Sequence, residues 1–203
     1  MISAQQALTR LREGNRRFAT GHSLRDDLIR SALGSSASGI QRPFAIILGC
    51  SDSRVPAEMV FDQGIGDLFV IRVAGNIVAP SQIGSVEFAA EQFGTRLVVV
   101  LGHSGCGAIQ ATLEEIRHPV SDRSPNLRAI VDRIRPVVEP LLDNRRGHDS
   151  EAVHEQAVRA NIRHSADALR HGSSLLEQMV EHDGLKIVGA EYSLTSGKVD
   201  FLD

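Results

Sequence analysis

The 203-residue chain has no tryptophan, one tyrosine and only 4% aromatic residues. Proteins that hold single-stranded nucleic acid stack the bases on aromatic side chains, so this scarcity argues against that class of function. The chain also lacks an excess of positive charge, because 22 Lys and Arg residues stand against 25 Asp and Glu, a net charge of -3. We therefore expect no nucleic-acid partner.

Long hydrophobic runs are missing as well. The longest apolar stretch, Leu97 to Leu101, is far shorter than the roughly 18 residues of a membrane span. The N-terminal segment has no continuous apolar region and carries Glu13 among its arginines, which is typical of neither a secretory signal nor a transit peptide. The sequence predicts no membrane association and a cytoplasmic location.

Cysteine is scarce, with Cys50 and Cys106 as its two occurrences. In a reducing compartment such a pair is more often buried, metal-bound or reactive than joined in a disulfide. The remaining composition, 42% hydrophobic and 23% charged, is that of an ordinary globular protein. A chain of this length can bury a core without covalent cross-links.

The pattern of apolar residues predicts an α/β fold. Residues 1–38 are expected to form an N-terminal helical arm, capped by Ser3 and ending in a flexible connector at residues 34–39. Residues 39–203 then form a single α/β domain, because continuous apolar runs alternate with helical segments. The expected strands of its mostly parallel central sheet, flanked by helices, are residues 44–48, 68–73 and 97–101, with two late edge strands within residues 185–202.

Polar residues follow two of these strands at their carboxyl ends, where ligands bind in parallel sheets. Cys50 follows the first strand, and His103 and Cys106 follow the third, so all three face one crevice if the strands are neighbours. Two thiolates and one imidazole suit tetrahedral Zn²⁺ and leave a fourth position open. The residues alone leave another interpretation open, in which the cysteines are small buried side chains and His103 caps a turn.

Asp52 and Arg54 lie in the loop between the first strand and Pro56. A carboxylate and a guanidinium at this spacing can form a bidentate pair that orients the carboxylate and keeps it ionised. Such an aspartate can bind a metal or accept a proton.

Three segments, Cys50-Ser51-Asp52-Ser53-Arg54-Val55-Pro56, Arg72-Val73-Ala74-Gly75-Asn76 and Gly102-His103-Ser104-Gly105-Cys106-Gly107, resemble the β-class carbonic anhydrases. The resemblance implies zinc bound by Cys50, His103 and Cys106, and a catalytic dyad of Asp52 and Arg54 in which Asp52 is a conditional fourth ligand. It also implies substrate binding by Gln41, from across a dimer interface, and by the amide of Gly107. The expected assembly is a homodimer or homotetramer with the active site at the dimer interface.

The implied activity is the reversible hydration of CO₂ to bicarbonate and a proton by zinc-bound hydroxide. Three alternatives remain: hydrolysis of CS₂ or COS on the same zinc scaffold, a thiol-based enzyme with Cys106 as nucleophile, and a structural zinc in a binding module. Two thiolates cancel the formal charge of Zn²⁺, so hydration activity is expected to rise in the mildly alkaline range.

Some members of this family carry a regulatory bicarbonate pocket built from Trp, Arg and Tyr. Arg72 and Tyr192 match two of its positions, but Ile47 stands in place of the Trp, so we expect this regulation to be weak or absent. The remaining polar groups of note are predicted to be solvated surface side chains: His154, His164, His171 and the pair Glu114 and Glu115.

Overall fold

The computed structural model describes residues 2–24, 41–119, 122–143 and 150–202, which build a five-stranded sheet in the order β2-β1-β3-β4-β5. The strands are β1 (Ala45–Gly49), β2 (Leu68–Arg72), β3 (Leu97–His103), β4 (Lys186–Tyr192) and β5 (Val199–Leu202). β1 to β4 run parallel to one another, and β5 is antiparallel to β4. The predicted α/β fold with a mostly parallel sheet is confirmed.

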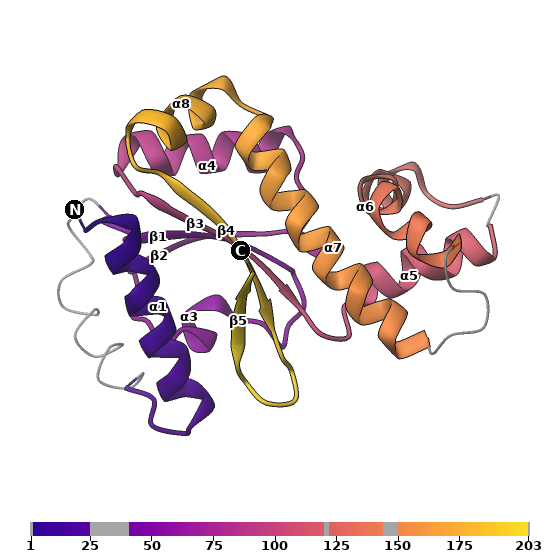
Figure 1. Ribbon diagram of the computed structural model, residues 1–203, viewed down its shortest axis with the longest axis horizontal. Helices are drawn as coiled ribbons and strands as arrows, with labels where there is room; N and C mark the ends of the chain where they lie inside the picture. The colour runs from indigo at the N-terminus through magenta and orange to yellow at the C-terminus, as the bar shows by residue number, and fades with distance from the viewer. Residues whose placement is uncertain (1, 25–40, 120–121, 144–149, 203) are drawn as a thin grey trace.

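Helices cover both faces of the sheet (Figure 1). They are α1 (Ala4–Ala19), α3 (Ala57–Val60), α4 (Pro80–Gln92), α5 (Gly107–Arg117), α6 (Pro125–Asp143), α7 (Ser150–His171) and α8 (Ser174–His182), with a 3-10 turn η1 (Ala74–Asn76). One core lies between the sheet and α1 and α3, and the other lies under α4, α7 and α8. Burial on both faces explains the unbroken apolar runs of β1 and β3, whose residues are all buried. No helix in the described ranges is long and apolar enough to cross a membrane.

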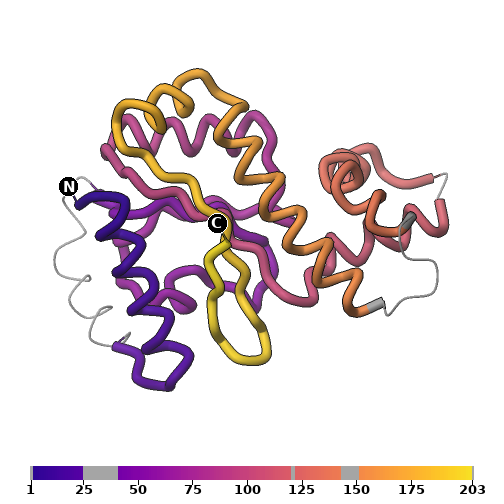
Figure 2. The backbone as a smooth tube through the Cα atoms, viewed as in Figure 1, coloured from indigo at the N-terminus to yellow at the C-terminus, as the bar shows by residue number. Residues whose placement is uncertain are grey.

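The prediction of two late edge strands is half wrong. β4 lies inside the sheet, between β3 and β5, and only β5 is an edge strand. The connection from β3 to β4, which contains the helices α5 to α8, is long enough to return the chain parallel to β3, whereas the short turn after β4 permits only antiparallel pairing. Figure 2 shows the resulting β4–β5 hairpin in yellow.

The N-terminal helix is fixed by caps and by a buried amide. Ser3 forms the predicted N-cap, accepting from the amide of Gln6 at 3.2 Å. Asn15 donates to the carbonyls of Val60 and Gly197 at 3.0 and 2.9 Å and accepts from the amide of Val199 at 2.9 Å. These bonds tie α1 to α3 and to the β4–β5 hairpin. The helix ends at Ala19, and residues 20–24 of the predicted helical arm are not helical. Residues 25–38 of the arm and the connector lie outside the described residues.

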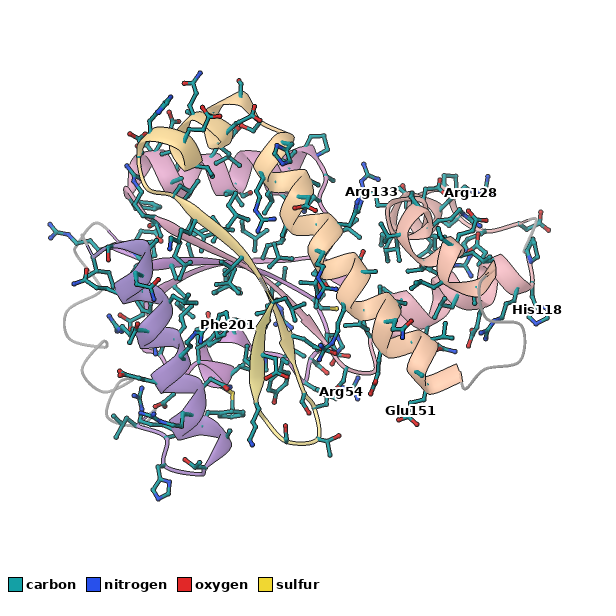
Figure 3. The ribbon with its side chains drawn as sticks, viewed as in Figure 1. Arg54, His118, Arg128, Arg133, Glu151 and Phe201 are labelled. Atoms are coloured by element: carbon teal, nitrogen blue, oxygen red, sulfur yellow. The ribbon has the colours of Figure 1, made fainter. Side chains whose placement is uncertain are left out.

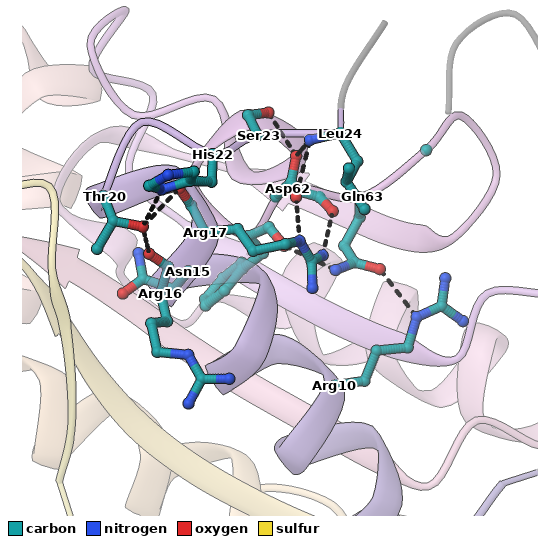
Figure 4. A network of polar contacts seen from close by, with 12 residues as sticks. Arg10, Asn15, Arg16, Arg17, Thr20, His22, Ser23, Leu24, Asp62 and Gln63 are labelled. Carbon is teal, nitrogen blue, oxygen red and sulfur yellow. Dashed lines mark hydrogen bonds and ion pairs between the residues drawn. The ribbon is translucent and has the colours of Figure 1, made fainter. Parts of the chain in front are cut away.

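A second attachment of this helix is centred on Asp62, whose carboxylate is buried after α3. Figure 4 shows Arg17, Ser23 and Leu24 converging on it, with Arg17 Nε at 2.6 Å from Oδ2. Burial opposes ionisation of Asp62, but the bonds from Ser23 and Arg17 hold its pKa below the usual carboxyl range. This cluster joins the C-terminal end of α1 to the loop that follows α3.

The expectation for Glu115 is wrong. Its side chain is buried, with Arg123 Nε at 2.7 Å and Arg135 Nη2 at 3.6 Å, while Glu114 stays exposed beside Gln110 as predicted. The sequence of α5 does not reveal that α6 packs over this position. The two arginines from the next segment make the burial of the charge tolerable.

Helix α7 approaches the sheet closely because two glycines face it. A Cβ atom on Gly102 of β3 would lie 2.5 Å from Ile162 Cγ1, and one on Gly189 of β4 would lie 2.7 Å from Ile162 Cγ2. Non-bonded carbon atoms do not approach one another so closely, so only glycine at positions 102 and 189 leaves room for the side chain of Ile162. The position of α7 relative to β3 is therefore closely defined.

We predict that Asp62→Asn lowers the free energy of unfolding by about 2 kcal/mol at pH 7, because a charged hydrogen bond to Arg17 is lost. The pKa of Asp62 is lower in the folded state than in the unfolded state. The stabilisation by ionised Asp62 is therefore complete above the unfolded-state pKa and is lost as the pH falls through the folded-state pKa. The difference from the parent in urea unfolding should therefore shrink below about pH 4. The control, Arg16→Ala at an exposed neighbour, should have little effect, and equal stability of parent and Asp62→Asn at pH 7 would contradict the prediction.

Candidate metal centre

Cys50, His103 and Cys106 meet because the strands that carry them are neighbours. Cys50 directly follows β1, His103 is the last residue of β3, and Cys106 is the N-cap of α5. Since β1 and β3 pair in parallel, both strands end at the same edge of the sheet. The expected convergence of the three side chains is thus found in the structure.

Their spacing suits a tetrahedral metal. The Sγ atoms of the two cysteines are 4.0 Å apart, and the ligand atoms of all three buried residues lie within 4.8 Å of one another. Around tetrahedral zinc, ligand atoms are roughly 3.3–3.8 Å apart. A small contraction of this cluster would bring the three atoms to that distance.

The histidine turns one ring nitrogen, Nε2, towards this cluster. Its Nδ1 lies 3.0 Å from the carbonyl oxygen of Ser104, which can only accept, so Nδ1 carries the proton. Nε2 is buried and has no hydrogen-bond partner among the described residues. A buried acceptor without a partner is costly, and a metal ion would supply that partner. The residues present therefore fit zinc.

Fixed dipoles surround both thiols. The amide of Gly75 donates to Cys50 Sγ at 3.4 Å, and the amides of Ile109 and Ala108, at the start of α5, partly oppose the rise in the pKa of Cys106 that its contact with Cys50 and its burial cause. The hydrogen bond between the thiols has the larger effect, lowering the pKa of Cys50 and raising that of Cys106. Cys50 therefore loses its proton easily, whereas formation of the second thiolate, at Cys106, needs a nearby cation.

Asp52 and Arg54 form the predicted bidentate pair. Arg54 Nε lies 2.9 Å from Oδ1 and Nη2 lies 2.7 Å from Oδ2, and the Arg54 amide adds a third bond at 2.9 Å. These hydrogen bonds from Arg54 hold the pKa of Asp52 well below its usual range. Oδ2 also lies 3.8 Å from His103 Nε2, while the Arg54 side chain extends towards solvent (Figure 3). The carboxylate thus stands between the metal ligands and the arginine.

The two predicted substrate-binding residues lie in different places. Gly107 is exposed at the first position of α5, where backbone amides lack helical partners. Gln41 precedes β1, at the opposite edge of the sheet from Cys50, and borders a hollow of about 460 Å³ with Arg10 and Arg96. That hollow is remote from the metal ligands, so Gln41 does not reach the site within one chain.

Arg72 has a role that the sequence did not reveal. Its Nε donates to the carbonyl of Cys50 at 3.1 Å and its Nη2 donates to that of Asp52 at 2.6 Å. The guanidinium therefore holds the loop that carries both residues. The resemblance had matched Arg72 to a regulatory pocket, and only the pairing of β1 with β2 reveals this contact.

The prediction that His154 is solvated is wrong. The side chain is half-buried, and its Nε2 lies 3.2 Å from the carbonyl oxygen of Cys106. No sequence signal indicates this contact, because the two residues are 48 positions apart and the surrounding helix is polar. His164 and His171 are exposed, as predicted.

Asn161 is a further residue that the sequence analysis missed. It is buried, and its Nδ2 donates to the carbonyl of Gly75 at 2.8 Å. One signal was available, because Asn161 lies four residues after the buried Ala157 and therefore on the apolar face of its helix. A polar residue at a core position commonly marks a specific hydrogen bond.

Comparisons with known proteins agree with this geometry. A family model described as "Carbonic anhydrase" matches residues 45–199. The chain is 36% identical to "Carbonic anhydrase 2" of Mycobacterium tuberculosis, covering 95% of this chain and 90% of that protein. It is 37% identical to a carbonic anhydrase of Mycolicibacterium smegmatis, over 94% and 89% of the two chains.

Similar solved structures indicate which class of carbonic anhydrase the chain resembles. The β-carbonic anhydrase CafA of Aspergillus fumigatus superposes with a TM-score of 0.75 at 25% identity, over 98% of this chain and 90% of that one. The β-carbonic anhydrase CcaA superposes with a TM-score of 0.74 at 27% identity, over 98% and 88%. With a family match over most of its length and a Cys-His-Cys cluster at the joined ends of β1 and β3, this chain belongs to the β-class carbonic anhydrases.

Proposed function

We propose that the protein catalyses the reversible hydration of CO₂ to bicarbonate and a proton at a zinc ion held by Cys50, His103 and Cys106. The observation that most supports this is the buried Nε2 of His103, which faces two cysteine sulfurs and has no partner within the described residues. Zinc bound there would acidify a water molecule and supply the nucleophile that attacks CO₂.

Asp52 and Arg54 would control the position of the reacting water. With its pKa held low by Arg54, Asp52 is ionised at neutral pH and can accept a hydrogen bond at Oδ2, the oxygen nearest to His103. Arg54 occupies both carboxylate oxygens and so keeps them away from the metal ligands. The amide of Gly107 would donate to the bound substrate.

We further propose that two chains complete each active site. Gln41 cannot reach Cys50 within one chain, since they lie at opposite ends of β1. A second copy would bring its Gln41 to the substrate in a homodimer or homotetramer. The two free, buried cysteines are compatible with the reducing cytoplasm, where we place the enzyme.

Zinc analysis and substrate assays on the same preparation separate this function from its rivals. A thiol-based enzyme would contain no stoichiometric zinc, and a hydrolase of CS₂ or COS would turn over those substrates in preference to CO₂. We expect one zinc per chain and CO₂ hydration.

Cys106→Ser should lose zinc and hydration activity together, because a serine hydroxyl is a poor ligand for zinc compared with a thiolate. Metal content by atomic emission and stopped-flow hydration measure the two effects. His118→Ala removes an exposed histidine outside the cluster and should change neither. A Cys106→Ser protein that hydrates CO₂ as fast as the parent would refute the ligand assignment.

Arg54→Ala should retain zinc but lose most hydration activity. Without its ion-pair partner, Asp52 would be an unpaired, largely buried carboxylate, and coordination of the metal is its best alternative. X-ray absorption or a crystal structure should then find Asp52 oxygen as the fourth ligand. Arg54→Lys keeps the charge without the bidentate geometry and should have intermediate activity. Full hydration activity in Arg54→Ala would count against the proposal that Arg54 keeps Asp52 from coordinating the metal.

Inhibition by bicarbonate at a separate pocket should be weak or absent. Ile47, in place of the Trp, is fully buried in β1. Of the two residues that do match, Arg72 is engaged by two backbone carbonyls of the loop that carries Cys50 and Asp52, so Tyr192 is the one without a role there. Tyr192→Phe is therefore a cleaner test than a change at Arg72. We expect no cooperative inhibition in the parent and no change in the variant. Cooperative inhibition that Tyr192→Phe abolishes would show that the pocket exists.

A further inference from the structure

Helix α7 directs two polar side chains at the backbone that supports the candidate metal ligands. His154 and Asn161 are seven residues apart, which places them on one face of the helix, two turns from each other. One contacts Cys106 itself, and the other contacts Gly75, whose amide donates to Cys50. We infer that His154 and Asn161 are positioning residues for the two thiolate ligands, an inference that rests on the proposed zinc site.

The first contact acts through the backbone of Cys106. Its carbonyl oxygen accepts from the amide of Gln110 at 3.0 Å, which is the first helical bond of α5, and from His154 Nε2 at 3.2 Å. Because a carbonyl can only accept, His154 carries its proton on Nε2. Two donors from different helices fix the orientation of this peptide. The direction of the Cys106 side chain follows from that of its backbone.

The second contact acts through Gly75, which adopts a left-handed conformation at φ +69°. A Cβ atom there would lie 2.9 Å from Ile134 Cδ1 and 3.1 Å from Ala108 Cβ, so a side chain would be strained by the conformation and would crowd its neighbours. In this conformation the Gly75 amide points at Cys50 Sγ, and its carbonyl accepts from Asn161 Nδ2 at 2.8 Å. Asn161 therefore holds the residue that donates to the thiolate.

The burial of Asn161 supports a specific role. The residue is 1% exposed, and its Oδ1 has no hydrogen-bond partner in the described part of the chain. Burying an amide with one end unsatisfied costs free energy. The bond from Nδ2 to Gly75 is the interaction of this side chain that offsets this cost.

A fixed helix makes these contacts effective. Ile162 inserts against Gly102 and Gly189, so α7 cannot slide along the sheet without steric conflict, and moving away from it would open a cavity. His154 and Asn161 thus project from a rigid element that already packs on β3, the strand that ends in His103. In this way one helix restrains both thiolates relative to the imidazole.

Outer contacts of this kind typically change metal affinity by roughly 10- to 100-fold when removed. We therefore expect His154→Leu and Asn161→Leu each to release zinc about 10-fold or more faster than the parent. The assay follows transfer of zinc from the loaded protein to a chromogenic chelator. The thiolate-to-metal charge-transfer band of the Co²⁺-substituted protein should also shift in both variants, because the sulfur positions change.

Two further variants separate positioning from general packing. His154→Gln retains an amide donor near the place of Nε2 and should restore slow zinc release. His164→Leu changes an exposed histidine on the same helix and should leave both readouts at parent values. If Asn161→Leu does not fold, the three variants at 154 and 164 decide the question.

The outcomes are distinct. A parent that binds zinc, with slow release and an unshifted Co²⁺ band in His154→Leu, would overturn the inference and leave the proposed function intact. A parent that binds no zinc would overturn both. Faster release in His154→Leu that His154→Gln does not restore would assign the effect to packing and also overturn it.

Discussion

The parallel pairing of β1 with β3 is the constraint on which the rest of the site depends. Cys50 and Cys106 are 56 positions apart, and nothing local holds them together. Pairing of Ile46 with Val98 through Gly49 with Leu101 sets both strand ends at one edge and fixes their register. A slip of one residue would turn buried side chains to the opposite face, so the hydrophobic core on each side of the sheet also determines the geometry of the ligands.

Charge at this edge is balanced by a small number of defined contacts. Two cysteine sulfurs 4.0 Å apart receive backbone amides from Gly75 and from the start of α5, and Asp52 is neutralised by Arg54. Arg72 holds the loop between them without joining an ion pair there, because it donates to carbonyls. Asp52, Arg54 and Arg72 therefore have fixed partners before any ligand binds, which reduces the reorganisation required for catalysis.

Buried carboxylates play a structural part away from the site. Asp62 fastens the end of α1 to the loop after α3, and Glu115 fastens α5 to Arg123, just before α6, and to Arg135 within α6. Both carboxylates form ion pairs with arginines of other segments, which allows their burial. They secure the peripheral helices around a sheet that is itself held by apolar packing.

Local sequence determined the strands of the sheet, the residues of the candidate metal centre and the start of the first helix. Continuous apolar runs bounded by turns predicted the parallel strands, and the motifs around Cys50 and His103 predicted the Cys-His-Cys cluster and the pairing of Asp52 with Arg54. These features are readable because each depends on residues within one segment or on the rule that parallel strands end together. Ser3 as a helix cap was readable for the same reason.

Only the tertiary structure decided the features that depend on contacts between distant segments. The interior place of β4 follows from the crossover through α5 to α8, and the burial of Glu115 follows from packing of α6 on α5. The contacts of His154 and Asn161 depend on how closely α7 lies on β3, which Ile162 and two glycines set together. A polar side chain on a helix has the same local pattern whether it meets solvent or a carbonyl from another element, so the sequence by itself cannot tell these two environments apart.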